Sequence, residues 1–406
     1  MDTNSSVSNT LETSQTAVTS AFKVGNFDKG ESRHELSSQW FNRPDDQRFL
    51  SLDALEDKVF KAAEESRSII VDVRDVEVVA SKDDADTLKL ILPGDNQVPV
   101  EPNHWSFSQT CGLLGLPAGY LRKLPAGLTA INLQYGLKTF REESIKAYTR
   151  HNGSHELRAA TGPEYGRIYD HELVKAVRTI AGNGTGDTRW KVPGMLDWST
   201  GTYDPFKPIT KESTTLFASD RDVFLFLVDD THPIEIGKLP DGSPDLIFRG
   251  FYAWNSEVGS KTLGLASFYL RGICCNRIMW GVENFQQMTI RHSKNAPSRF
   301  GYEARPALES FANSSEVKLL TGIKAARDAV VAKTDEDREE FLGRRGFTKP
   351  ETKAIIDAVL KEEGKPAASV WDFVQGITAV ARGKGHQDER VTFEQRASKL
   401  LDKVSA

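Results

Sequence analysis

The side chains best suited to chemistry lie in one stretch of the chain, between Trp254 and Ser293. Arginines recur along it, and aromatic residues stand between them. Guanidinium groups pair with phosphate oxygens and flat rings stack on bases, so this mixture is typical of proteins that hold single-stranded nucleic acid. We expect the arginines to contact phosphates, the rings to stack on bases, and the asparagine to bond a base or brace its loop. The candidate contacts are Trp254, Tyr269, Arg271, Asn276, Arg277, Arg291 and His292.

The charge balance of this stretch differs from that of the rest of the chain. Residues 261–305 carry 7 Lys and Arg against 2 acids, whereas the 406-residue chain carries 52 against 57, a net charge of −5. A local basic face on an acidic protein is the electrostatic pattern expected for phosphate contact. The alternative that remains open is that these arginines pair with acids elsewhere in the fold.

Catalytic motifs are not completed anywhere in the sequence. The run Gly259-Ser260-Lys261-Thr262 resembles the end of a phosphate-binding loop. However, Ser260 separates the glycine from the lysine, and Trp254 occupies the position of the upstream glycine. Cys274 is interpreted as a buried strand residue, because no histidine partner and no Gly-x-Ser-x-Gly elbow accompany it. We therefore expect no catalytic residues and no cofactor.

Two groups of metal-binding residue types also lack the required spacing. His151 and His155 are four residues apart, but Asn152-Gly153-Ser154 between them predicts a turn, so the two rings cannot share a helical face. Four carboxylates at the ends of a predicted hairpin suggest a magnesium site, yet such residues are more often solvated turn residues. They are Asp220, Asp222, Asp229 and Asp230. No metal site is expected.

Residues 107–124 have the spacing of a helix-turn-helix, with Cys111 facing Leu121 and Gly115 at the sharp turn. Arg122 and Lys123 are the only basic residues on the second helix, and its recognition positions carry no Asn, Gln or Arg to read base edges. A structural corner of two short helices is therefore the favoured interpretation.

The stretch between Trp254 and Ser293 needs a sheet to position its side chains. Residues 246–254, 263–273 and 288–290 are rich in residues that favour strands, and Asn255-Ser256 with Gly259-Ser260 supply a turn. Residues 214–218 and 223–228 predict a further hairpin, and residues from about 302 onward predict helices, with helix-start signals at Thr348 and Ser369. The fold class is α+β: a central antiparallel sheet with flanking helices, a helical C-terminal region and a disordered N-terminal tail. The predicted parts are 1–38 (tail), 39–188 (α/β), 189–301 (β-rich) and 302–406 (helical).

The compartment follows from what the sequence lacks. No apolar run approaches the roughly 20 residues that span a bilayer, and the N-terminus has no signal-peptide pattern. The three cysteines are too few for a disulfide framework. We expect a cytoplasmic protein with no membrane contact.

The order of several short motifs resembles that of the phage/plasmid-like protein family known as domain of unknown function 932. The elements are Trp105, Leu113, Pro117, Tyr120, Leu124-Pro125, Leu157-Arg158-Ala159, Tyr165, Ile168 and the segment 255–293. Relatives commonly have Ser-His-Asp-Gly-Ser where this chain has Ser256-Glu257-Val258-Gly259-Ser260, so no role of that histidine transfers. The resemblance implies a protein of a phage, plasmid or integrated element, and it implies no established reaction.

Together these features predict a non-catalytic nucleic-acid-binding protein that holds single-stranded DNA during recombination or replication. The alternative is a regulatory protein that binds a protein partner through its helical C-terminal region, and an enzyme with an unrecognised site is a third possibility that stays open. Whether the protein forms a homo-oligomer stays open.

Overall fold

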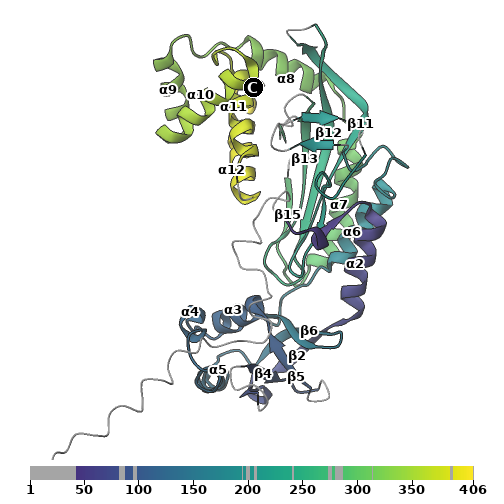
Figure 1. The fold of residues 1–406 in the computed structure, drawn as a ribbon, viewed down its shortest axis with the longest axis vertical. Helices are drawn as coiled ribbons and strands as arrows, with labels where there is room; N and C mark the ends of the chain where they lie inside the picture. Colours follow the sequence, from purple (N-terminus) through teal and green to yellow (C-terminus); the bar gives the residue numbers. More distant parts are fainter. Residues whose placement is uncertain are drawn as a thin grey trace, which may run out of the picture. The chain divides into compact units, whose positions relative to one another are not determined.

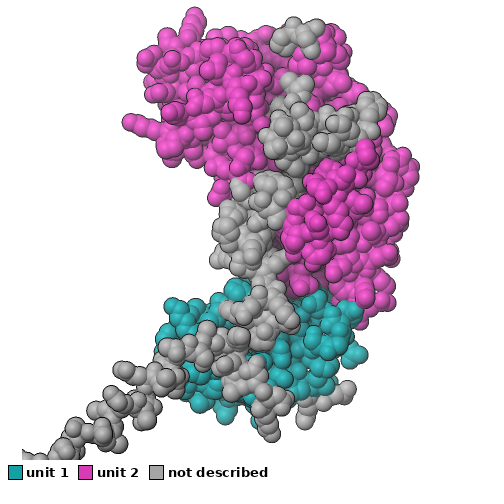
Figure 2. All heavy atoms as spheres, viewed as in Figure 1, with its two compact units in different colours: residues 1–32, 65–163 teal, residues 33–64, 164–406 magenta. Residues whose placement is uncertain are grey.

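The computed structural model describes residues 43–81, 87–94, 98–193, 195–197, 202–204, 208–239, 242–272, 277–278, 287–312, 314–384 and 387–405. The chain divides into two compact units, and the figures show each of them (Figures 1 and 2). Unit 1 contains residues 1–32 and 65–163, and unit 2 contains residues 33–64 and 164–406. Both combine helices with a sheet, which confirms the α+β class. The predicted tail, residues 1–38, lies outside the described residues.

Unit 1 is built on a mixed sheet with the strand order β2-β6-β7-β5-β4-β3, in which β5 and β7 are parallel and the other neighbours are antiparallel. Asn103 is the N-cap of the helix that begins at His104, because its side chain accepts hydrogen bonds from the Trp105 and Ser106 amides. The strands are β2 (Ser66–Asp72), β3 (Glu77–Ala80), β4 (Leu88–Ile91), β5 (Pro99–Pro102), β6 (Ser144–His151) and β7 (His155–Thr161). The helices are η4 (Val73–Asp75), α3 (His104–Leu113), α4 (Ala118–Leu121) and α5 (Ala126–Thr139).

Unit 2 is built on an antiparallel sheet with the order β1-β10-β11-β12-β13-β14, and β15 also pairs with β13. Its long strands confirm the predicted central sheet, and the hairpin of β10 and β11 confirms the turn expected at residues 219–222. The strands are β1 (Arg48–Phe49), β10 (Leu216–Ala218), β11 (Val223–Lys238), β12 (Pro244–Asn255), β13 (Leu263–Arg271), β14 (Arg277–Ile278) and β15 (Gln287–Ile290), with β8 (Met195–Asp197) and β9 (Thr202–Asp204) forming a separate pair.

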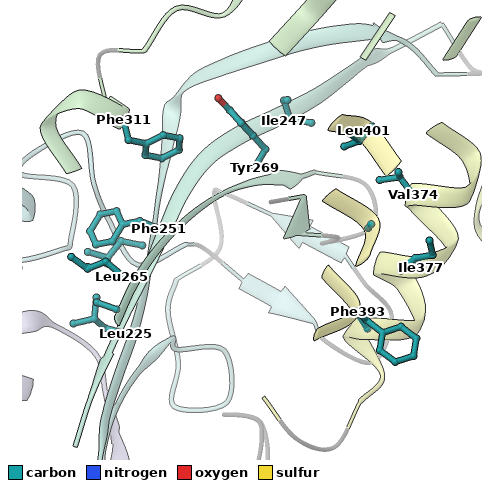
Figure 3. Packing of buried hydrophobic residues seen from close by; sticks show 14 of the residues in the cluster. Leu225, Ile247, Phe251, Leu265, Tyr269, Phe311, Val374, Ile377, Phe393 and Leu401 are labelled. Carbon is teal, nitrogen blue, oxygen red and sulfur yellow. The ribbon is translucent and has the colours of Figure 1, made fainter. Parts of the chain in front are cut away.

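Both faces of this sheet are apolar. Side chains alternate between faces along a strand, so neighbouring residues of β12 and β13 belong to two different hydrophobic clusters. One face carries Leu225, Phe251 and Leu265 and packs against α7 through Phe311 (Figure 3). The other face carries Phe226 and Phe268, whose ring centroids are 4.7 Å apart. Strands buried on both faces read as continuous apolar runs, as β13 does.

The helices of unit 2 share one hydrophobic cluster with the sheet, which includes Val374 and Ile377 of α11 and Leu401 of α12 (Figure 3). The predicted N-caps Thr348 and Ser369 are confirmed, because each accepts a hydrogen bond from the amide three residues on. The helices are η3 (Asp45–Gln47), α2 (Leu52–Glu64), α6 (Asp170–Ala181), α7 (Ala296–Ala312), α8 (Val317–Asp328), α9 (Asp335–Gly343), α10 (Lys349–Glu363), α11 (Val370–Arg382) and α12 (Gln387–Ser405).

The division into units differs from the predicted division into parts. Helices α2 and α6 pack against each other in unit 2, whereas the sequence placed both in an N-terminal part that ended at residue 188. The C-terminal helices are likewise a portion of unit 2. Truncation of the chain near residue 302 would remove these helices and expose the core that they share with the sheet.

Candidate functional site

Three separate segments of unit 2 meet around a buried polar cluster. The segments are 165–170, 255–261 and 290–293, and all three carried the family resemblance. Asn255 joins two of them, because its side-chain amide donates hydrogen bonds of 2.8 Å to the Ile168 carbonyl and to the Asp170 carboxylate. The Asp170 amide in turn donates to the Glu257 carboxylate at 3.2 Å. A buried polar frame therefore holds these segments together.

His292 attaches the third segment to this frame. Its ring stacks on Tyr165 with centroids 5.0 Å apart, and its Nδ1 lies 3.2 Å from the Gly166 carbonyl oxygen. Burial lowers the pKa of His292 to about 4, and the positive charge of Arg167 also lowers it, while hydrogen bonds that the ring donates to the Gly166 and Lys261 backbone oppose the change. The ring is therefore neutral at physiological pH and serves as an internal brace.

The Asn-Ser-x-x-Gly-Ser segment forms the turn that its residue types predicted. Gly259 has a φ of +82°, which favours glycine, and the Ser256 hydroxyl accepts from the Ser260 amide at 2.9 Å. The same hydroxyl donates to the Arg221 carbonyl. Strand β13 follows the turn, with no helix between them. The serine hydroxyl is used inside the protein, and the segment does not have the strand-loop-helix form of a phosphate-binding loop.

Three of the four aspartates at the ends of the β10–β11 hairpin are not solvated, which corrects the sequence interpretation; they are Asp222, Asp229 and Asp230, whereas Asp220 is exposed. The Asp230 side chain is 2% exposed and lies 2.9 Å from Nζ of Lys191.

Asp222 receives two hydrogen bonds of 2.8 Å from Arg43. Burial by itself would raise the pKa of Asp222, but Arg43, Lys261 and Ser219 outweigh it and hold the pKa at about 2. Asp222 is therefore an anchor that ties the segment before β1 to the sheet.

Asp229 is also fully buried, at a register shift in β11. It accepts from Arg189 at 2.7 Å and from the Thr231 hydroxyl at 2.8 Å, and it lies 2.9 Å from Nδ1 of His232. Burial raises the pKa of Asp229, and these hydrogen bonds together bring it below its ordinary value. No local sequence pattern indicates the bulge in β11 that assembles this group. Among the described residues, no three metal-binding side chains come together here or elsewhere.

Arg271, a predicted phosphate contact, lies inside unit 2. Its side chain is 3% exposed and donates two hydrogen bonds, of 3.0 and 2.9 Å, to Asp245. It also contacts Glu363 of α10 and lies 3.2 Å from the amide oxygen of Gln375. The alternative that the arginines pair with acids elsewhere in the fold therefore holds for Arg271, which is not available to a nucleic acid.

The two predicted stacking rings lie on opposite faces of the sheet. Tyr269 is buried on the face that packs against Phe311. Trp254 is half-buried on the other face, where it stacks on Tyr252 at 5.3 Å and covers Gly264. A ladder of buried aromatic rings extends from Trp254 across this face, and these rings fill the core. The two residues cannot form one stacking platform.

The remaining predicted contacts have different positions. Arg291 is exposed, immediately before the buried His292. Arg277 of β14 pairs through its backbone with Leu270 of β13. The side chain of Arg277 is not described. Asn276 lies outside the described residues.

The helix-turn-helix pattern of unit 1 is a structural corner, as the favoured interpretation held. Gly115 has a φ of +68°, and Cys111 and Leu121 are both buried. Helix α4 is a single turn, and Arg122 folds back onto α3, where it donates to the His104 carbonyl at 2.9 Å and covers the Phe107 ring. The residue that would have faced a DNA groove is therefore used to pack the corner.

Comparisons with known proteins add no relatives. No family model matches the chain, and neither the curated proteins nor the solved structures contain a significant match. In the described part of the chain, no helix is both long and apolar enough to cross a bilayer.

Proposed function

We propose that the protein is a non-catalytic nucleic-acid-binding protein that contacts a single strand along the segment from Arg291 to Tyr302. The observation that carries the proposal is Tyr302, whose ring is 82% exposed on α7. Three residues before it on the same helix stands Arg299, and residues three apart are neighbours on a helical surface. An exposed ring beside a guanidinium group is the pairing that holds a base and its phosphate.

The cations that precede Tyr302 extend this surface toward the polar cluster. Arg291 and Lys294 are exposed, and His292 between them fixes the backbone against Gly166. Two surface ion pairs accompany these cations: Lys294 lies 3.5 Å from Glu164, and Arg299 lies 2.9 Å from Glu303. Exposed pairs of this kind contribute little energy and exchange readily, so phosphate oxygens can replace the carboxylates.

The proposed contact surface lies at one edge of the sheet, whereas the sequence predicted a surface on the face of the sheet. The sheet's own arginines support this change: Arg271 is paired with Asp245, and Arg249 donates to Glu316 at 3.2 Å and to the Ser314 carbonyl at 3.0 Å. Of the predicted contacts, Arg291 is kept. A phage or plasmid setting, with recombination or replication as the process, is part of the proposal and is supported only by the sequence resemblance.

Fluorescence anisotropy with labelled single-stranded DNA, duplex DNA and single-stranded RNA tests the proposal across a salt series. We expect the single strands to bind more tightly than the duplex, because a duplex keeps its bases stacked on each other. The logarithm of the binding constant should fall with the logarithm of salt concentration, by about 0.7 for each phosphate contacted on a single strand. Lack of binding to every probe at low ionic strength would refute the proposal.

A pair of matched variants locates the surface. Tyr302→Ala should weaken single-strand binding by about 1–3 kcal/mol, because base stacking on a protein ring contributes that much. Tyr135→Ala is the control, since Tyr135 is 70% exposed on α5 of unit 1 and likewise has a cation, Lys138, three residues away on its helix, but lies outside the proposed segment. Equal losses in the two variants would show that binding does not depend on this edge.

A further inference from the structure

The β6–β7 hairpin of unit 1 places two histidines directly opposite each other. His151 is the last residue of β6 and His155 the first of β7, and the two are paired in register. The three residues between them form the turn, in which Gly153 has a φ of +95°. This is the turn that Asn152-Gly153-Ser154 predict, and because of it the two histidines do not share a helical face. The hairpin instead brings the two rings together, because residues that flank a three-residue turn become a cross-strand pair.

The ring nitrogens of the pair are close enough to share one ligand. Nδ1 of His151 lies 2.7 Å from Nδ1 of His155, and the ring planes are inclined at 56°. The Nε2 of His151 lies 3.2 Å from the Thr149 hydroxyl. In the tautomer whose Nε2–H donates to that hydroxyl, Nδ1 of His151 accepts a hydrogen bond from Nδ1–H of His155. A metal ion that replaces this shared proton would bind the same two nitrogens, and a hydrogen bond from the far ring nitrogen is the arrangement that orients a histidine for a metal.

The backbone that carries the pair is held on both sides. The His151 amide donates to the Glu65 carbonyl at 2.8 Å, and the adjacent cross-strand pair is an ion pair of Arg150 and Glu156. The Glu156 carboxylate is itself buried and accepts from Asn103 at 2.7 Å. His155 and the turn are exposed and His151 is half-buried, so an ion can reach the two rings from solvent.

We propose that His151 and His155 form a two-imidazole site for a divalent transition metal with square-planar or octahedral geometry, Cu²⁺ or Ni²⁺. With metal–nitrogen bonds of about 2.0–2.1 Å, a nitrogen separation of 2.7 Å subtends an angle of roughly 80° at the metal. That angle is near the right angle between neighbouring ligands in those geometries. A tetrahedral Zn²⁺ would need the nitrogens roughly 3.4 Å apart. The described residues supply no third ligand, so water or an external ligand completes the coordination.

Titration of the tag-free, full-length protein with Cu²⁺, followed by electron paramagnetic resonance, tests the site. The wild-type spectrum should show coupling to two equivalent imidazole nitrogens, with one ion bound before any weaker sites fill. His151→Ala and His155→Ala should each weaken this first site at least tenfold. His232→Ala should leave it unchanged, because His232 is an exposed histidine that pairs with a carboxylate and not with a second ring.

Two results would overturn the inference. A wild-type spectrum without coupling to two nitrogens would show that the rings do not bind together, and this readout needs no variant to fold. A first site of equal affinity in the His151→Ala/His155→Ala double variant would show that the ion binds elsewhere. Calorimetric titration with Zn²⁺ gives a further check, since Zn²⁺ should bind more weakly than Cu²⁺ or Ni²⁺.

Discussion

Gly166 packs directly against the backbone of Ser293. A Cβ atom at Gly166 would stand 1.8 Å from the Ser293 carbonyl oxygen and 2.6 Å from the carbonyl carbon. Real Cβ contacts are never this short, so the absence of a side chain at Gly166 is what lets the two segments cross. The crossing holds His292 against Tyr165 and fixes the exposed Arg291 beside it.

Replacement of Gly166 by alanine should therefore destabilise unit 2. The added methyl group meets backbone, which moves less easily than a side chain, so we expect a loss near the upper end of the 1–3 kcal/mol typical of overpacking. Urea denaturation followed by tryptophan fluorescence measures it. Gly162→Ala is the control, because nothing lies within 4 Å of a Cβ at Gly162, and its stability should change by less than about 0.5 kcal/mol. Equal stability of the two variants would mean that the crossing is not close-packed.

The Arg271–Asp245 pair predicts a second stability effect. Arg271→Ala leaves Asp245 buried beside Arg327 alone, at 3.0 Å, and leaves Glu363 without its arginine. Breaking a buried ion pair from one side costs about 3–5 kcal/mol. Arg271→Lys should restore part of this, since lysine keeps the charge and loses the two-pronged geometry. The measurement is again urea denaturation, with the exposed Arg291→Ala as the control. Unchanged stability of Arg271→Ala with weaker nucleic-acid binding would instead make Arg271 a phosphate contact.

Features that depend on residues close together in the sequence were predicted correctly, and features that depend on distant residues were not. The hairpin at Asn152-Gly153 and the caps at Thr348 and Ser369 depend on residues within a few positions of each other, and the sequence predicted all of them. The partners of Arg271 lie 26 and 92 residues away. A basic run in the sequence therefore could not be distinguished from a set of internal ion pairs.

The predicted stacking residues Trp254 and Tyr269 show a second reason why the sequence alone could not locate a binding surface. Alternation along a strand is a local property, but the face on which a ring lies depends on the register between strands. Trp254 pairs with Gly264, whereas Tyr269 pairs with Arg249, which places the two rings on opposite faces. The bulge in β11 that collects Arg189 and His232 around Asp229 likewise has no signature in the sequence.

The low pKa of His292 predicts that acid weakens unit 2 above the range in which carboxylates titrate. The ordinary histidine pKa is 6.5, and burial lowers it to about 4 in the folded state. Above pH 6.5 the ring is neutral in both states. Between pH 6.5 and about 4 the unfolded chain binds a proton that the folded protein does not, so stability falls as pH falls. One pKa unit corresponds to about 1.4 kcal/mol, so the loss at pH 5 is on the order of 2 kcal/mol.

The contribution of His292 is isolated by comparing the wild-type protein with His292→Asn at pH 7 and pH 5. The asparagine amide takes the position of Nδ1 and can still hydrogen-bond the Gly166 carbonyl, but it does not titrate. The variant should lose less stability than the wild-type protein between these two pH values, whatever its stability at pH 7. Parallel losses in the two proteins would assign the acid sensitivity to other groups.

Charge reversal at Arg291 tests the proposed binding edge through its salt dependence. If Arg291 contacts one phosphate, Arg291→Glu should weaken single-strand binding and reduce the slope of log affinity against log salt by about 0.7. Its side chain is exposed, so the folded structure should keep its stability. Lys353→Glu on α10 is the matched control, because it makes the same change of charge at another exposed cation of unit 2. A specific contact changes the slope for Arg291→Glu alone, whereas a purely net-charge effect shifts both variants equally and removes Arg291 from the surface that we propose.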